Sequence, residues 1–255
     1  MKIVLIGTGN VATVLGKKLL AAAHTILQVA GRNVATTEAL STTLKAIPCL
    51  HLSDLTKEAD IYIVAVSDKS LEEVVSQLSL TDQLVVHTAG SMPMDILKNV
   101  SGRYGILYPY QSINKEVAPL PAITIFVDGS TLEIKQQLLS LAKTISARVG
   151  EANDEQRKQY HLCAILVNNF SNYFYAVAEQ YCRQHQLDFR NLLPLIQETA
   201  NRLEHFFPRE VQTGPAIRND SLTIQKHLDL LNDNPGLQEL YRILSKSIQA
   251  FPWKG

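Results

Sequence analysis

Residues 1–12 read MKIVLIGTGNVA, and this stretch decides the fold of the chain. The apolar run from Lys2 to Ile6 ends in the spacing G-x-G-x-x-A, and helical periodicity continues from Asn10 to about Ala23. The first glycine permits a tight turn, the second lets the backbone approach a pyrophosphate, and the small last residue lets helix and strand pack closely. A plain structural turn is the alternative, but the strand before the motif and the helix after it favour dinucleotide binding. The expected contacts are Gly7, Thr8, Gly9, Asn10, Val11 and Ala12.

Short β-branched runs alternate with helix-like stretches through residue 150, which is typical of a parallel sheet covered on both faces. Helices are also expected after Arg32, Asp68 and Met92, and from Ser130 to Ser146. The predicted strands are Lys2 to Ile6, Thr25 to Ala30, Ile61 to Val66, Leu84 to His87, Arg103 to Tyr108, Ala122 to Val127 and Ala147 to Gly150. We therefore predict an α/β fold, with a Rossmann-type and mostly parallel sheet over residues 1–150.

The β-branched runs end there, and helical periodicity predicts an all-helical domain over residues 151–255. Asp154 to about Gln184 is predicted as one long helix, roughly 45 Å in length at the usual rise per residue. Its apolar surface around Phe170, Phe174 and Val177 predicts a homodimer, because the helices that follow are too short to cover it. Those helices are expected near Asn191 to Phe206, Asp220 to Leu231 and Pro235 to Ala250.

The composition excludes several classes of protein. Among the 255 residues, 24 lysines and arginines balance 24 aspartates and glutamates, so no basic surface for nucleic acid or an anionic membrane is expected. The cysteines lie far apart without a C-x-x-C pair, and the histidines lack paired metal spacing, so no metal site is predicted. No apolar run approaches the ~18 residues of a membrane span, and we expect a cytoplasmic protein.

The turn after the second predicted strand indicates which dinucleotide binds. NAD-binding folds usually place an acidic residue there, about 20 positions after the glycine motif, where it bonds the ribose 2′-hydroxyl. This chain instead has Gly-Arg-Asn at positions 31–33, and an arginine beside a small polar residue suits a 2′-phosphate. NADP(H) is therefore the expected cofactor, with Arg32 and Asn33 as contacts, and an ordinary solvated arginine is the alternative. Val66 and Ser67, at the end of the third predicted strand, are further expected contacts.

Ligands of open α/β sheets bind outside the carboxyl ends of the strands, so the segments after His87 and Tyr108 are expected at one rim. Ser91 there is either a hydroxyl that contacts the substrate or a helix N-cap. Gln111 is an expected substrate contact. His87 is expected beside the cofactor, although a histidine at the end of an apolar strand is more often buried and internally satisfied. Asp68 lies either at the cofactor or at a helix N-cap.

On the long predicted helix, His161, Asn168 and Asn169 are spaced seven and eight residues apart, which places them on one stripe. Their neighbours are apolar, so these polar groups need partners, which either a pocket or other helices supply. His161 is the expected general acid, because an unperturbed imidazole titrates near pH ~6.5. We expect Asn168 to act beside it and Asn169 to bind substrate. Arg218 is the expected carboxylate anchor; Asp220 either orients Arg218 or His161 or caps a helix.

Several separated motifs carry a resemblance to one family. They are the amino-terminal loop, Gly31-Arg32-Asn33, His87-Thr88-Ala89-Gly90-Ser91, Tyr108-Pro109-Tyr110-Gln111-Ser112, Tyr160-His161 with Asn168-Asn169, and Thr213-Gly214-Pro215 with Arg218 and Asp220. The chain resembles oxidoreductases that join a Rossmann-like NADP-binding domain to a carboxy-terminal helical domain of unknown function. That family is similar in layout to pyrroline-5-carboxylate reductases, deazaflavin-dependent NADP reductases, 3-hydroxyisobutyrate dehydrogenases and ketopantoate reductases. In the dehydrogenases a hydroxyl at the position of Ser91 contacts the substrate.

Two positions depart from these relatives. The hydroxyacid dehydrogenases carry a catalytic lysine followed four residues later by asparagine, whereas Leu162 stands four residues after Lys158, so that lysine mechanism does not carry over. The carboxy-terminal motif of the family usually has glycine where this chain has Asn219. A local difference in that loop is expected.

Residues and resemblance together predict an NADPH-dependent reductase that transfers hydride to a small carbonyl or imine bearing a carboxylate. Two alternatives stay open. One is a catalytically idle NADP-binding sensor or scaffold, which would bind NADPH without oxidising it in the presence of 2-keto acids or cyclic imines. The other is a partner-binding protein whose phosphate loop is empty, which would bind neither dinucleotide.

Overall fold

The computed structural model describes residues 1–120 and 122–253 and divides into two compact units, Met1–Tyr175 and Ala176–Gly255. The division falls within the helix that spans Ser171–Gln184. The last strand of the sheet ends at Glu151, one residue past the domain boundary predicted at residue 150. The first half of the long helical stretch thus stays with the sheet.

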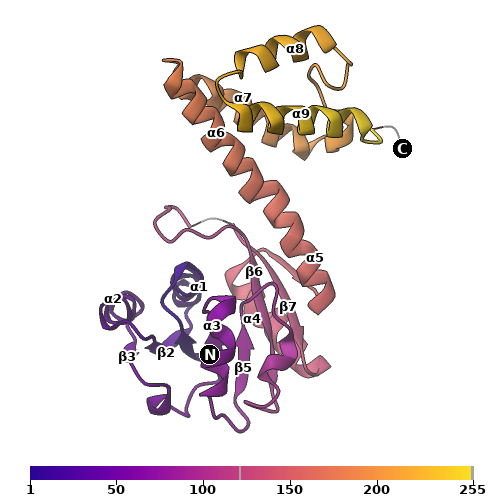
Figure 1. Cartoon of the computed structure of the whole chain (residues 1–255). Helices are drawn as coiled ribbons and strands as arrows, with labels where there is room; N and C mark the ends of the chain where they lie inside the picture. Colours follow the sequence, from indigo (N-terminus) through magenta and orange to yellow (C-terminus); the bar gives the residue numbers. More distant parts are fainter. Residues whose placement is uncertain (121, 254–255) are drawn as a thin grey trace. The chain divides into compact units, whose positions relative to one another are not determined.

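The first unit is built on an eight-stranded sheet (Figure 1). Its strands are β1 (Lys2–Ile6), β2 (Thr25–Ala30), β3 (Ile47–Cys49), β4 (Ile61–Val64), β5 (Leu84–His87), β6 (Tyr104–Tyr110), β7 (Thr124–Gly129) and β8 (Arg148–Glu151). Their order is β3-β2-β1-β4-β5-β6-β7-β8, and every neighbouring pair is parallel except β6 and β7. The predicted α/β fold with a mostly parallel, Rossmann-type sheet is confirmed.

Alternation of side chains along the strands divides the core into two apolar layers. Four helices cover the sheet: α1 (Asn10–Ala21), α2 (Val34–Leu44), α3 (Asp68–Ser76) and α4 (Leu132–Ile145). Ile3 and Leu5 of β1 pack in one layer with apolar residues of α1, α2 and α4. Val4 and Ile6 pack in the other with Leu71 of α3. Because β1 contributes to both layers, the strand that leads into the phosphate loop is fully enclosed.

Two elements of the first unit differ from the prediction. β3 was not predicted, because it has only three residues and includes Pro48, a residue tolerated at the edge of a sheet where no N–H is needed. The helix expected after Met92 is a single 3₁₀ turn, Met94–Leu97, whose N-cap residue is Pro93. Short 3₁₀ pieces commonly serve as connectors, and this one buries Leu97 against the second apolar layer.

The long predicted helix is continuous but not regular. It consists of α5 (Asp154–Ala164), a π-helical turn (Ile165–Phe170) and α6 (Ser171–Gln184). Asn153 and Gln156 form a capping box at the start of α5. A π turn widens the helix and shifts the register, so the regular 3.6-residue helix on which His161, Asn168 and Asn169 were expected to form one stripe is not present.

The second unit is helical, and its last two helices contact each other (Figure 1). Its further helices are α7 (Leu193–Asn201), α8 (Ser221–Leu230) and α9 (Pro235–Ala250), and 3₁₀ turns cover Phe189–Leu192, Arg202–Glu204 and Pro208–Glu210. His227 of α8 and Tyr241 of α9 are joined by a hydrogen bond of 2.7 Å. Within residues 1–120 and 122–253, no helix is long and apolar enough to cross a membrane.

Candidate functional site

The loop between β1 and α1 has the geometry that a close approach of phosphate requires. Gly7 takes φ +124°, a left-handed conformation, and a Cβ there would lie 2.2 Å from the carbonyl oxygen of Ala65. Gly9 is the N-cap residue of α1, and a Cβ there would meet no atom within 4 Å. Gly7 is therefore fixed by the fold, whereas Gly9 leaves open space in front of the helix amides.

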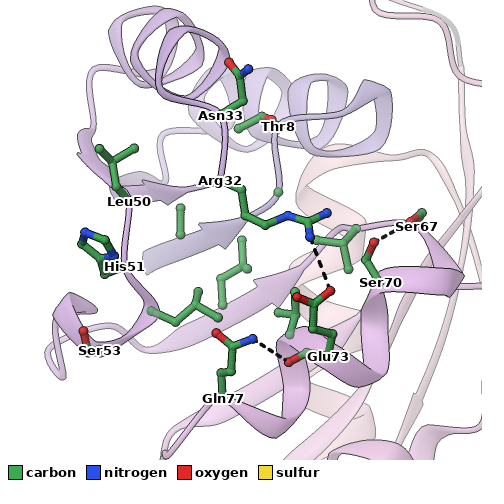
Figure 2. Close-up of a pocket in the computed structure, with 17 residues that line it drawn as sticks. Thr8, Arg32, Asn33, Leu50, His51, Ser53, Ser67, Ser70, Glu73 and Gln77 are labelled. Atoms are coloured by element: carbon green, nitrogen blue, oxygen red, sulfur yellow. Dashed lines mark hydrogen bonds and ion pairs between the residues drawn. The ribbon is translucent and has the colours of Figure 1, made fainter.

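A cavity of about 690 Å³ extends from this loop to the turn after β2 (Figure 2). Thr8, Arg32 and Asn33 line it from the β1 and β2 ends, and Ser67 and Glu73 line it from the segment of α3. Val66 also lines it, so the structure brings these predicted contacts together at one cavity. The remaining lining residues include the segment 50–53 after β3.

Arg32 and Glu73 form an ion pair at this cavity. Arg32 Nη1 lies 3.4 Å from Glu73 Oε2, and the two side chains are 75% and 58% exposed, so the pair is a weak one that a ligand can replace. Sequence reasoning missed Glu73, which lies on α3. Nothing in the sequence around Glu73 indicates that its side chain faces Arg32, which follows β2. Asn33 is also the N-cap of α2, where its Oδ1 accepts from Thr36 N at 2.9 Å.

The last two residues of the glycine motif pack α1 against the sheet. Ala12 is fully buried within α1, and Val11 is partly buried against the same apolar layer. Their side chains therefore pack the helix on the sheet, and a contact with the cofactor would come from their backbone amides in the first turn of α1. Asn10 is the exposed first residue of α1.

His87, at the end of β5, is completely buried. Its Nδ1 accepts from the backbone N–H of Ala89 at 3.1 Å, so Nε2 carries the proton and donates to the carbonyl oxygen of Pro93 at 3.2 Å. Both ring nitrogens are used inside the protein, which corrects the expectation that His87 contacts the cofactor. Burial lowers the pKa of His87 to about 4, so the ring is neutral at physiological pH.

This buried imidazole predicts a loss of stability in weak acid. The unfolded chain takes up the proton near the ordinary histidine pKa of 6.5 and the folded protein only near 4, so the unfolded state binds more protons between these values. We expect the free energy of unfolding to fall by roughly 3 kcal/mol from this group as the pH drops through that window. Urea titrations at several pH values measure it. The His87→Asn variant serves as the control and should lose this part of the slope; equal slopes would contradict the assignment.

Asp68 and Ser91 meet at the carboxyl end of the sheet. Asp68 is the first residue of α3, and its Oδ2 accepts a hydrogen bond from Ser91 Oγ. Ser67, and not Asp68, is the N-cap residue of α3, and Pro93 caps the following 3₁₀ turn, so neither Asp68 nor Ser91 is the helix cap that was the alternative. The hydroxyl of Ser91 is exposed and next to a carboxylate, a position compatible with the expected substrate contact.

His161 of α5 lies beside the end of β6. Its Nδ1 is 3.3 Å from the hydroxyl oxygen of Tyr108, a buried residue that the sequence placed in a family motif without giving it a role. Phe126 of β7 stacks on Tyr160 with ring centroids 4.5 Å apart, which holds α5 against the sheet. The histidine expected to act as the acid is therefore anchored at the same rim as Ser91.

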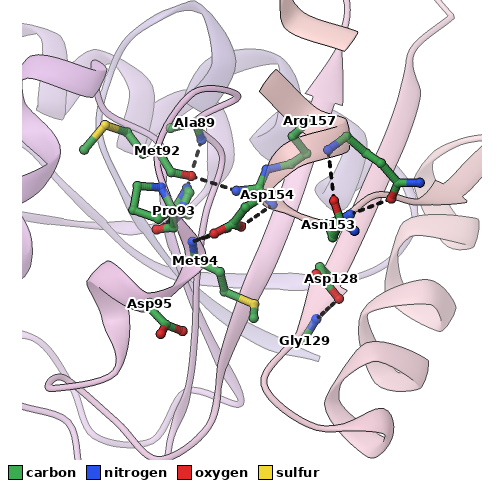
Figure 3. Close-up of polar contacts among 12 residues, drawn as sticks. Ala89, Met92, Pro93, Met94, Asp95, Asp128, Gly129, Asn153, Asp154 and Arg157 are labelled. Atoms are coloured by element: carbon green, nitrogen blue, oxygen red, sulfur yellow. Dashed lines mark hydrogen bonds and ion pairs between the residues drawn. The ribbon is translucent and has the colours of Figure 1, made fainter. Parts of the chain in front are cut away.

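An ion pair between the buried Arg157 and the partly exposed Asp154 holds the loop after β5 to the start of α5 (Figure 3). Arg157 is fully buried; its Nη1 lies 2.9 Å from Asp154 Oδ1, without the alignment of a hydrogen bond, and its Nη2 donates to Met92 O at 2.7 Å. Both carboxylate oxygens of Asp154 accept from Met94 N, each at 3.2 Å. Sequence reasoning missed this arrangement, because the backbone partners Met92 and Met94 lie 65 and 60 positions upstream of Arg157 and Asp154.

Three other expected site residues are exposed in the chain. Asn168 and Asn169 lie in the π turn among exposed apolar side chains, so the expectation that they are buried is wrong for the single chain. Gln111 donates to Ala122 O at 3.0 Å and accepts from Ser112 N at 2.9 Å, which makes it a brace of its own loop.

Arg218 and Asp220 belong to the second unit. Asp220 is the N-cap residue of α8, where it accepts from Thr223 N at 3.0 Å, and the hydrogen bonds from Thr223 lower the pKa of its carboxyl. Asp220 is thus the helix cap, which was one of its two expected roles. Asn219 takes φ +54°, a left-handed conformation that asparagine tolerates, so the loop accommodates it where the resembling family has glycine. Arg218 is exposed.

Metal-binding side chains do not gather anywhere in the described ranges. Within residues 1–120 and 122–253, no group of three or more histidine, cysteine, aspartate or glutamate side chains could hold a metal ion.

Comparisons with known proteins cover the whole chain. Residues 1–108 match the model of a Rossmann-like domain, and residues 123–248 match a domain of unknown function, DUF2520. A search of curated proteins finds no match. Among solved structures, the chain is 37% identical to BF3122 of Bacteroides fragilis, provisionally assigned as an NADP oxidoreductase, with 98% of each chain covered and a TM-score of 0.88.

Two more distant structures share the fold. Protein TM1727 of Thermotoga maritima is 20% identical with a TM-score of 0.80, and the alignment covers 97% of this chain and 98% of TM1727. A 1-pyrroline-5-carboxylate reductase of Streptococcus pyogenes is 16% identical with a TM-score of 0.66, and it covers 98% of this chain and 99% of its own. The similarity thus extends through both units and includes a reductase of known substrate.

Proposed function

Because the chain belongs to the family of BF3122 of Bacteroides fragilis, provisionally assigned as an NADP oxidoreductase, and matches the Rossmann-like and DUF2520 domains, we propose that it is an NADPH-dependent reductase of a small carbonyl or imine. The observation that carries the proposal is the open space at Gly9, next to a cavity that Gly7, Thr8 and Arg32 line together. Such a path suits a pyrophosphate at one end and a 2′-phosphate at the other.

The residues of the cavity fit NADP(H). The backbone from Gly7 to Gly9 and the N-terminus of α1 would hold the pyrophosphate, and Arg32 would leave Glu73 to bind the 2′-phosphate. When bound, NADPH supplies the hydride. His161 would then hold the proton that the substrate receives, and Ser91, with its hydrogen bond to Asp68, would orient the acceptor group.

A substrate that bears a carboxylate is the finer part of the proposal. A guanidinium binds a carboxylate through two parallel hydrogen bonds, and Arg218 presents an exposed guanidinium beside the cap of α8. Asn168 and Asn169 present amides on the exposed π turn, where they are available to a substrate. Arg218→Ala would then raise KM for a carboxylate substrate more than for its uncharged analogue.

Fluorescence titration with NADPH, followed by a panel of 2-keto acids and cyclic imines, tests the function. Tight binding with oxidation by at least one panel member supports a reductase. Binding without oxidation by any compound would favour a sensor or scaffold. Failure of both NADPH and NADH to bind at millimolar concentration would overturn the dinucleotide site itself.

Arg32→Ala is expected to separate the two cofactors. The variant loses a charge-assisted contact worth roughly 1.5 to 3 kcal/mol with the 2′-phosphate, so NADPH should bind about 10- to 150-fold more weakly and NADH nearly as before. Isothermal titration calorimetry with both cofactors measures the two dissociation constants. Arg103→Ala is the matched control, because this exposed arginine lies before β6, at the amino ends of the parallel strands. Equal losses for NADPH and NADH would overturn the role of Arg32.

We further propose that a second copy of the chain covers the apolar face of α5, the π turn and α6. Leu162, Val167, Phe170 and Tyr173 are each more than half exposed in the single chain. Burial of such a face is the usual reason for an isologous dimer. Sedimentation should show a dimer at micromolar concentration and a folded monomer for Val167→Asp, whose side chain is 72% exposed. Monomers of the unchanged protein would contradict the dimer.

A cytoplasmic location is the remaining part of the proposal. Cys49, Cys163 and Cys182 are all free thiols, and Cys49 and Cys182 are buried. Free thiols persist in a reducing compartment. Fractionation of cells that express the protein tests this location.

A further inference from the structure

The contact between Tyr108 and His161 joins two elements that are far apart in the chain. Tyr108 lies near the carboxyl end of β6, His161 lies in the last turn of α5, and both belong to the first unit. Their Oη and Nδ1 atoms are 3.3 Å apart. The ring of His161 is only partly buried, so its other nitrogen is the one available to a ligand.

The hydroxyl of Tyr108 has little freedom to move. A Cβ on Gly90 would lie 2.8 Å from both Cζ and Oη of Tyr108, which shows that the phenol packs directly on the backbone of the loop after β5. Tyr110 packs against the same ring in an edge-to-face arrangement, with ring centroids 6.0 Å apart. The oxygen that faces His161 is therefore placed by the loop that carries Ser91 and by the sheet.

The protonation of Tyr108 decides the direction of the hydrogen bond. Burial, with smaller contributions from Tyr110 and Asp68, raises the pKa of Tyr108 to about 12, so the phenol keeps its proton at physiological pH. A neutral imidazole has one N–H and one nitrogen that accepts. A phenol O–H is a better donor to imidazole nitrogen than an imidazole N–H is to a phenol oxygen, because the phenol is the stronger acid.

We propose that Tyr108 is a positioning residue that donates its hydrogen bond to Nδ1 of His161 and thereby holds the proton of the neutral ring on Nε2. The nitrogen that faces away from β6 would then be the one that delivers a proton. The catalytic meaning of this placement rests on the proposed reductase function, but the tautomer does not. Tyr108 itself transfers no proton in this scheme, since its hydroxyl stays engaged with Nδ1.

The tautomer can be measured without a substrate. Two-dimensional ¹⁵N–¹H spectra of the imidazoles, recorded at a pH where they are neutral, distinguish a protonated nitrogen from an accepting one. The signals of His161 are identified by their loss in His161→Gln. In the unchanged protein we expect Nδ1 of His161 to be an accepting, hydrogen-bonded nitrogen and Nε2 to carry the proton.

Tyr108→Phe removes only the donor. We expect the population of the Nδ1–H form of His161 to rise about fivefold and the Nδ1 resonance to move to that of a free acceptor, the effect of losing one hydrogen bond. Tyr110→Phe is the matched control, from the same strand and the same aromatic group, and should leave His161 unchanged. His227, whose Nδ1 pairs with Tyr241, should stay unchanged in both variants and serves as an internal reference.

Two results would overturn the proposal: a proton on Nδ1 of His161 in the unchanged protein, or identical His161 spectra in the unchanged protein and Tyr108→Phe. Should Tyr108→Phe not fold, the unchanged sequence made with 3-fluorotyrosine gives the same test, because a more acidic phenol strengthens the hydrogen bond and shifts the Nδ1 resonance further. An unmoved resonance would then overturn it. The protein could also prove to lack reductase activity while the proton of His161 lies on Nε2 as expected. Tyr108 would then still position His161, and His161 would have another role.

Discussion

Gly9→Val should bind neither NADPH nor NADH and should nevertheless unfold at the same temperature as the unchanged protein. Gly9 has φ −79° and ψ −171°, a conformation open to any residue, and its added side chain would meet no protein atom within 4 Å of Cβ. The valine would instead occupy the space in front of α1 that a pyrophosphate needs. Isothermal titration calorimetry measures the binding, and thermal unfolding measures the stability.

Two further glycines show that the effect belongs to the position. Gly102→Val makes the same change at another site where a Cβ meets no atom within 4 Å, on the turn before β6, so binding and stability should stay as they were. Gly7→Val should lose both, because φ +124° and a Cβ 2.2 Å from Ala65 O strain the backbone itself. Undiminished NADPH binding by Gly9→Val would place the pyrophosphate elsewhere.

His161→Ala should reduce turnover by roughly 10²- to 10⁴-fold once a substrate is found, with NADPH affinity nearly intact. The imidazole lies at the end of β6, whereas the cavity that ends at Arg32 is lined by other elements, so proton delivery and cofactor binding are separable. Single-turnover oxidation of NADPH measures the chemical step directly.

An exposed histidine of the second unit, His185, supplies the control for His161→Ala. His185 follows α6 and packs on Tyr181, with ring centroids 4.2 Å apart, and His185→Ala should retain full turnover. If His161→Ala is also fully active, the proton comes from another group, and Ser91 with its partner Asp68 or a bound water becomes the next candidate. Ser91→Ala then distinguishes these two sources.

The parts of the fold that sequence reasoning predicted are those with strong local signals. β1, β2 and α9 have the predicted bounds, because an apolar run followed directly by glycine marks the end of a strand and a proline after an asparagine cap marks the start of a helix. The three-residue β3 and the π turn gave no such signal: the first is too short for a pattern, and the second differs from an α-helix only in its register.

The candidate site divides in the same way. The glycine motif and Arg32 could be predicted because loop and turn lie within one βαβ segment. The hydrogen bond from Tyr108 joins residues 53 positions apart, and the ion pair of Arg32 with Glu73 joins residues 41 positions apart. Only the completed sheet brings such partners together, so no local pattern encodes them.

The strand order has a consequence for how the protein is made. β1 is synthesised before the other strands of the sheet and lies inside it; β2 and then β3 add to one of its edges, and β4 to β8 add one after another to the other edge. Each new strand therefore meets an open edge as it leaves the ribosome, and none has to insert between two strands that are already paired. The sheet is complete at Glu151, before the helical unit exists, so the cofactor-binding half can fold during translation while the rest is still being added.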